Sequence, residues 1–158
     1  MRQTFDRRSV LGLAVGSAAG AVFVSSARPT YAAATSYKAT LSGTTEVPPT
    51  TSSGKGTATV TYDAATKKAT WQGDFSGLSG PATAAHIHGP GEAGKNAGVL
   101  LPLSQKDVPF TSPFTGSATL PDDKAAAFEA ALSGGQAYVN VHTAANPGGE
   151  LRGQLAKA

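Results

Sequence analysis

Short alternating runs of apolar and polar residues, separated by glycine, proline, serine and threonine, fill the chain from residue 36 onward. A period of two with regular turn residues predicts an all-β domain. Eight such runs favour a Greek-key β-sandwich of two packed sheets. The expected strands are Ser36–Leu41, Gly56–Tyr62, Lys68–Phe75, Ala82–His88, Val99–Leu103, Thr115–Leu120, Ala137–Thr143 and Glu150–Leu155.

One segment departs from this rhythm and predicts a short helix. Pro121–Asp123 is typical of a helix start, and Gly134-Gly135 is typical of a helix end. Phe128, Ala131 and Leu132 fall on one helical face. We therefore expect this helix to cover one end of the sandwich.

Residues 1–34 have the features of an export signal. Arg7-Arg8 precedes the mildly apolar stretch Val10–Val24, and Ala32–Ala34 forms an A-x-A processing site. The paired arginines resemble a twin-arginine signal, and a general secretory signal is the alternative. The apolar stretch is about 15 residues long, shorter than the roughly 20 of a membrane-spanning helix. We predict that residues 35–158 are a periplasmic or secreted domain with no membrane insertion after cleavage.

The charge balance changes when this leader is set aside. The chain has 13 basic and 10 acidic residues. Four of the basic residues and one of the acidic residues lie in residues 1–34, so the remaining domain is formally neutral. A neutral domain lacks the basic surface that nucleic-acid binding requires. The chain also lacks cysteine and can form no disulfide, so an apolar core must stabilise the fold.

Three histidines fall in two strand-like segments of the chain. His86 and His88 occupy positions i and i+2 of one predicted strand, so both imidazoles face the same side, about 6.5–7 Å apart. His142 lies on the polar side of another predicted strand. If the two strands are neighbours, the three imidazoles can bind one metal ion and leave a coordination position open. The alternative is three solvated histidines with no shared role.

The ligand set restricts the metal. The only methionine is Met1 and there is no cysteine, so thiolate and thioether ligands are absent from the domain and a blue-copper centre is excluded. Imidazole nitrogen with an added oxygen favours Cu(II), with Zn(II) as the alternative. Metal-bound histidines are usually oriented by a second hydrogen bond. The side chains expected to supply or support it are Glu46, Asn140, Glu150 and Arg152.

Other chemistry finds little support. Arg152 is the one arginine after residue 34, and we expect it to pair with Glu46 or Glu150, to attract an anion, or to form an ordinary surface pair. Gly89–Asn96 nearly matches a phosphate-binding loop, but Asn96 replaces the hydroxyl residue and a strand follows in place of a helix. We therefore expect no nucleotide site. No nucleophile–base pair is present, and no catalytic residue is assigned.

Motifs along the whole domain resemble the chordin-domain (CHRD) family. The matching segments are Tyr37–Gly43, Glu46–Pro49, Ala85–Pro90, Tyr138–Thr143 and Gly149–Gln154, within residues 36–156. The resemblance implies an immunoglobulin-like or related β-sandwich, commonly extracytoplasmic. In animal chordins, such domains accompany modules that bind growth factors.

The pair His86-x-His88 is also similar to copper–zinc superoxide dismutases. Those enzymes use more histidines and a disulfide. A dismutase-like oxidoreductase here would therefore need a smaller site that holds copper alone. Two hypotheses remain. The first is an exported copper- or zinc-binding protein that uses His86, His88 and His142. If it is an enzyme, this hypothesis implies a redox or superoxide-related activity. The second is a non-catalytic extracytoplasmic module that binds a protein or a surface polymer.

Overall fold

The computed structural model describes residues 33–158, apart from residues 106, 107 and 109. The predicted export signal therefore lies outside the described residues, except for its last two positions. All eight predicted strands and the predicted helix are present, and a short ninth strand is added. The elements are β1 (Thr35–Ser42), η1 (Gly43–Thr45), β2 (Lys55–Asp63), β3 (Lys68–Ser76), β4 (Ala82–His88), β5 (Val99–Pro102), β6 (Phe114–Thr119), α1 (Asp122–Ser133), β7 (Tyr138–Thr143), β8 (Leu151–Gln154) and β9 (Ala156–Lys157).

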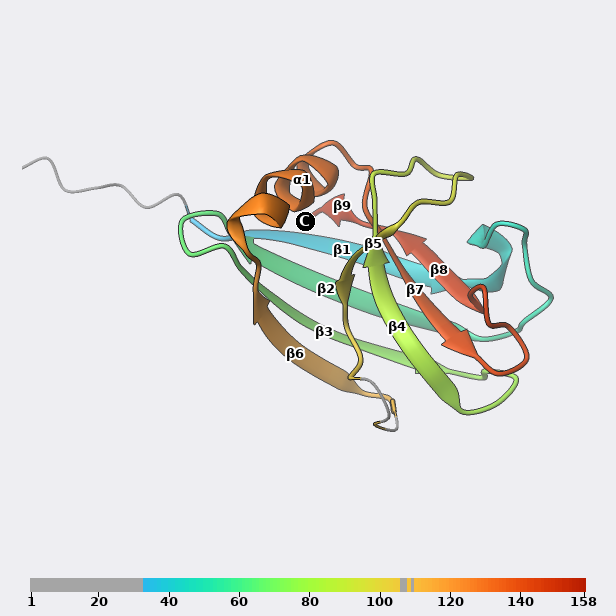
Figure 1. Cartoon of the computed structure of the whole chain (residues 1–158). Coiled ribbons are helices and arrows are strands. Elements are labelled where there is room, and N and C mark those ends of the chain that lie inside the picture. Colours follow the sequence, from blue (N-terminus) through green and yellow to red (C-terminus); the bar gives the residue numbers. More distant parts are fainter. Residues whose placement is uncertain (1–32, 106–107, 109) are drawn as a thin grey trace, which may run out of the picture. The chain divides into compact units, whose positions relative to one another are not determined.

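The strands form one antiparallel sheet in the order β5-β4-β7-β8-β1-β2-β3-β6, with β9 paired to β1. The sheet curls so that its two halves face each other (Figure 1). The pair Ser42–Arg152 joins β1 to β8 and makes the halves continuous. The all-β class with one short helix is confirmed. The two packed layers are halves of one sheet rather than separate sheets, because β8 continues the hydrogen-bonded order into β1.

The core fills the space between the two halves. Along β2, Ala58, Val60 and Tyr62 are buried, whereas the threonines between them are more exposed. This alternation is the pattern of a strand with one face on the core. The opposite half contributes Ile87 and Val139, which are fully buried. Burial of such side chains is the main force that stabilises the domain.

Helix α1 covers one end of this core, as its apolar face predicts. Phe128 is fully buried and meets the ring of Tyr62 edge-on, with 5.2 Å between ring centroids. Asp122 and Asp123 lie in the first turn, where acidic residues favour the helix dipole. Within the described residues, no helix has the length and apolar character needed to cross a membrane.

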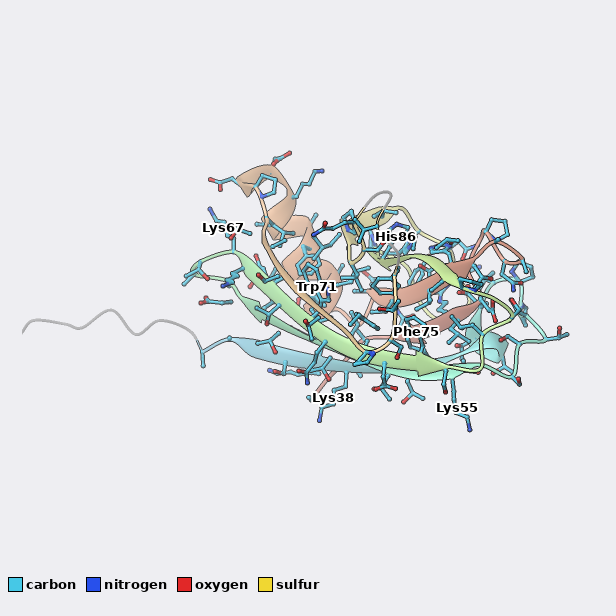
Figure 2. The ribbon with its side chains drawn as sticks, turned by 90° about the horizontal axis from the view of Figure 1, so that it is seen from below. Lys38, Lys55, Lys67, Trp71, Phe75 and His86 are labelled. Carbon is cyan, nitrogen blue, oxygen red and sulfur yellow. The ribbon has the colours of Figure 1, made fainter. Side chains whose placement is uncertain are left out.

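Strands β7 and β8 break the alternation because they are buried on both faces. Tyr138, Asn140 and Arg152 are all buried, although they lie on the polar side of their strands. Figure 2 shows that Lys38 and Lys55 point away from the domain on the side opposite His86. The domain therefore has one solvated outer face, on β1–β3, and one covered outer face, on β7 and β8. The covered face adjoins the histidines.

Candidate metal centre

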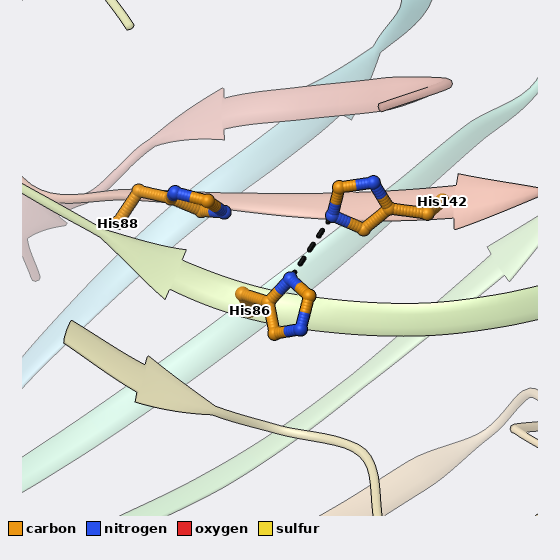
Figure 3. A group of neighbouring side chains, drawn as sticks. All are labelled: His86, His88 and His142. Carbon is orange, nitrogen blue, oxygen red and sulfur yellow. Dashed lines mark hydrogen bonds between the residues drawn. The ribbon is translucent and has the colours of Figure 1, made fainter. Parts of the chain in front are cut away.

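The structure brings the three predicted imidazoles together. Strand β4 carries His86 and His88 and pairs directly with β7, which carries His142. The side chains of His86 and His142 meet, with 3.0 Å between Nδ1 of His86 and Nε2 of His142 (Figure 3). One nitrogen from each of the three rings lies within 4.8 Å of the other two. The cluster forms because β4 and β7 are neighbours and direct their polar side chains to the same face of the sheet.

Two of the imidazoles are held by backbone carbonyls. His88 donates from Nδ1 to the carbonyl oxygen of Ala97 at 2.9 Å, and His142 donates from Nδ1 to that of Pro147 at 3.0 Å. A carbonyl can only accept, so both rings carry their proton on Nδ1 and keep a free lone pair on Nε2 when neutral. The Nδ1 atom of His86 then donates to Nε2 of His142. Nε2 of His88 is buried and has no hydrogen-bond partner among the described residues.

His86 and His142 are neutral at neutral pH. Burial, together with the nearby His142 and His88, lowers the pKa of His86 to about 4. Burial also lowers the pKa of His142, against the opposing effect of its bond to Pro147. A neutral imidazole is the form that binds a metal ion. The cluster therefore needs no deprotonation of these two rings at neutral pH before it can coordinate.

The spacing fits a single transition-metal ion after a small adjustment. Two nitrogens bound to one zinc ion are at most about 4.2 Å apart, because each Zn–N bond is about 2.1 Å. The largest separation in the cluster is at most 4.8 Å, so small rotations of the side chains suffice. The unpartnered Nε2 of His88 also fits a metal, because a buried nitrogen without a partner is costly. To hold an ion through Nδ1, His86 would give up its hydrogen bond to His142 and carry its proton on Nε2, so that Nδ1 offers a lone pair.

The side chains expected to orient the imidazoles lie close by, but carbonyl groups do this instead. Among the described residues, Glu46, Asn140, Glu150 and Arg152 make no hydrogen bond to an imidazole. Nothing in the sequence marks Ala97 or Pro147 for that role, since every residue offers a carbonyl. No role at the site was predicted for Tyr138, although its side chain lies on the same side of β7 as that of His142. Its ring stacks on His88, with 5.0 Å between centroids and an interplanar angle of 5°.

Glu46 and Asn140 form a buried polar pair next to the cluster. Asn140 is the cross-strand partner of His86, and its Oδ1 has no hydrogen-bond partner. Burial raises the pKa of Glu46, whereas the backbone N–H of Val47 and the Arg152 charge lower it. Gly149 allows this packing, because a side chain there would collide with both the Glu46 carboxylate and the Asn140 amide. Glu46 therefore lies against Asn140, the cross-strand partner of His86, and neither side chain bonds to an imidazole.

Glu150 belongs to a separate network of hydrogen bonds. Its carboxylate accepts from the side chains of Ser52, Ser79, Thr143 and Asn146 and from the backbone N–H of Ser79, at 2.6–3.1 Å. The side chain is fully buried. Thr143 directly follows His142, and Asn146 precedes Pro147, whose carbonyl holds His142. Glu150 thus organises the turn that carries an orienting carbonyl.

The Glu150 network makes stability depend on pH. Burial alone raises the pKa of Glu150, but the hydrogen bonds from Ser79, Thr143 and Ser52 outweigh it and hold the pKa at about 2. The folded-state pKa is therefore below the ordinary value of 4.5. Stabilisation by this group is complete above about pH 4.5 and is lost as the pH falls toward 2. We expect a loss of about 3 kcal/mol in the free energy of unfolding from this group over that range.

Urea unfolding at a series of pH values checks this expectation, with the fluorescence of Trp71, the sole tryptophan, as the signal. A Glu150→Gln variant should lack this part of the pH dependence. An identical decline in the variant and the wild type between pH 4.5 and 2 would assign the effect to other carboxylates.

Fold and site together define an all-β domain that gathers three imidazoles on one half of a curled sheet. The family model for the CHRD domain matches residues 37–155. The chain therefore belongs to the CHRD domain family, and this membership supports the class of an extracellular binding module that the sequence motifs imply. Comparison with curated proteins gave no match, and comparison with solved structures gave none either.

Proposed function

We propose that this CHRD domain is an exported binding module for a transition-metal ion, held by His86, His88 and His142. The observation that carries the proposal is the orientation of two imidazoles by the carbonyls of Ala97 and Pro147. Each carbonyl fixes the proton on Nδ1, so Nε2 turns its lone pair toward the common cluster. Metal-binding histidines are usually oriented in this way.

Copper(II) is the expected ion, and zinc(II) is the alternative. The described domain offers no sulfur ligand, because the chain has no cysteine and its only methionine is Met1. Imidazole suits both ions, and at equal availability copper binds more tightly. Three nitrogen ligands leave a position open for water or a small molecule. A redox activity such as superoxide dismutation would take place at that position. Export by the predicted twin-arginine signal belongs to the same proposal.

A titration of the purified domain tests the binding. We expect one Cu(II) ion per chain, and weaker one-to-one binding of Zn(II), followed by isothermal titration calorimetry. The proton uptake or release on binding should be small at pH 7, because His86 and His142 are already neutral there. Absence of saturable binding by either ion, in protein never exposed to a chelator, would remove the proposal.

Family membership supports a second candidate function, the binding of a protein or a surface polymer. The histidines would then have no part in recognition. Capture of a partner from periplasmic extract should be equal for the wild type and for a variant with all three histidines replaced. Loss of capture on replacement of the histidines would tie recognition to the metal site and contradict an independent binding surface.

A further inference from the structure

Arg152 is buried within a cage of loop acceptors. Only 2% of its surface is exposed. Its guanidinium donates to the carbonyl oxygens of Glu92 at 3.1 Å and Lys95 at 2.8 Å, and to Oδ1 of Asn96 at 3.2 Å. A phosphate-binding loop presents N–H groups to an anion. The similar sequence Gly89–Asn96 instead presents oxygen atoms to a cation, and that cation is Arg152.

The caged loop leads directly to the group that orients His88. Ala97 follows Asn96, and its carbonyl accepts the Nδ1 proton of His88 at 2.9 Å. The backbone N–H of Ala97 donates to the hydroxyl of Tyr138 at 3.0 Å. Asn96 also donates to the carbonyl of Val47 at 2.9 Å, which ties the loop to the segment after η1. Ala97 is therefore fixed on both sides.

Tyr138 provides a second connection between Arg152 and His88. Strand β7 lies between β4 and β8 in the sheet, so Tyr138 stands between the strands that carry His88 and Arg152. The guanidinium carbon of Arg152 lies 3.5 Å from the centre of the Tyr138 ring. The same ring stacks on the imidazole of His88. Movement of Arg152 would therefore disturb both the carbonyl and the ring that hold His88.

We propose that Arg152 is a positioning residue that fixes the orientation and the Nδ1–H tautomer of His88 through the Glu92–Ala97 loop and Tyr138. The significance for metal binding rests on the proposed function. Three N–H groups of Arg152 are bonded to acceptors of the loop, so its guanidinium serves to hold the loop in this arrangement. Lysine cannot replace it, since a single ammonium lacks the planar fork that both stacks on a ring and bonds to several acceptors.

The first test uses metal-free protein and is independent of metal binding. With three histidines in the chain, a ¹H–¹⁵N spectrum of the imidazoles reports each tautomer separately. In the Arg152→Lys variant we expect His88 to lose its single Nδ1–H tautomer, while His142, held by Pro147, keeps its own. Asn96 is exposed, so Asn96→Ala should fold and produce the same change to a smaller extent. An unchanged His88 tautomer in both variants would overturn the proposal.

The second test measures the metal site. Loss of an orienting partner typically weakens metal binding 10–100-fold. We expect that loss of Cu(II) affinity in Arg152→Lys, with the number of imidazoles counted by electron spin-echo spectroscopy falling from three to two. Phe128→Leu in helix α1 serves as a control, because Phe128 is buried against Tyr62 of β2 and the substitution should lower stability while leaving every group that holds an imidazole unchanged. Equal losses of affinity in the control and in Arg152→Lys would show that Arg152 acts through general stability.

The two tests also separate this inference from the proposed function. If the wild type binds no metal ion, the metal function fails, and the spectrum of the metal-free protein still decides the role of Arg152. If the wild type binds metal through three imidazoles and both variants do so equally well, the metal function stands and the role assigned to Arg152 is wrong.

Discussion

A variant with His86→Ala, His88→Ala and His142→Ala should contain no Cu(II) or Zn(II) when the wild type contains about one ion per chain. The physical reason is that these rings are the only nitrogen ligands of the cluster and that the chain has no further histidine and no cysteine. Backbone carbonyls alone do not hold either ion tightly. Elemental analysis of protein isolated from the exported fraction gives the metal content directly.

The fold should survive these substitutions, so the loss can be assigned to the ligands. The three hydrogen bonds that the imidazoles make, to one another and to the carbonyls of Ala97 and Pro147, contribute only about 1 kcal/mol each. A matched control replaces Thr59, Gln72 and Thr115 with alanine, because these residues form one cross-strand row of β2, β3 and β6. The control should keep its full metal content. Equal metal content in the histidine variant and the wild type would place the metal elsewhere and refute the assignment.

Replacement of Glu150 by glutamine should lower the free energy of unfolding by about 3 kcal/mol at pH 7. The carboxylate accepts hydrogen bonds from Ser52, Ser79, Thr143 and Asn146 in a fully buried position. The carboxamide of glutamine presents two N–H donors to a site already filled with donors. At least one buried donor then loses its partner, and the charge that strengthens the other bonds is gone.

Urea unfolding at pH 7 measures the effect, and Glu129→Gln supplies the control. Glu129 lies exposed on α1, so the same chemical change there should alter stability by less than about 0.5 kcal/mol. A Glu150→Gln variant as stable as the control would mean that the hydroxyl groups rotate to serve glutamine equally well. The network would then owe nothing to the charge of Glu150.

The alternation of apolar and polar residues predicted most of the fold. In β2 the buried residues alternate with threonines, and in the second half of β4 buried Ala85 and Ile87 alternate with His86 and His88. This period predicted that His86 and His88 share one face. The strand pairing at Ser42 and Arg152, which joins the halves into one sheet, could not be predicted from the sequence. Strand pairing between residues more than one hundred positions apart leaves no periodic trace in either strand.

The grouping of the three histidines could be predicted, but their surroundings could not. His142 was placed by parity, because Val139 and Val141 mark the opposite side of β7 as the core side. The carbonyls of Ala97 and Pro147 depend on loop paths that no side-chain pattern encodes. The surroundings of Arg152 could not be predicted for the same reason. Its sequence neighbours suggested ion pairs with glutamates, whereas the folded chain surrounds it with loop carbonyls.

Diffraction from a crystal of copper-loaded protein, collected at the copper absorption edge, tests the central claim most directly. The account predicts one anomalous peak about 2 Å from Nε2 of His88, Nε2 of His142 and one ring nitrogen of His86. The Nδ1 contacts of His88 and His142 to Ala97 and Pro147 should persist in that crystal. A peak at any other position would contradict the account. So would an intact His86–His142 hydrogen bond with no peak between the three imidazoles.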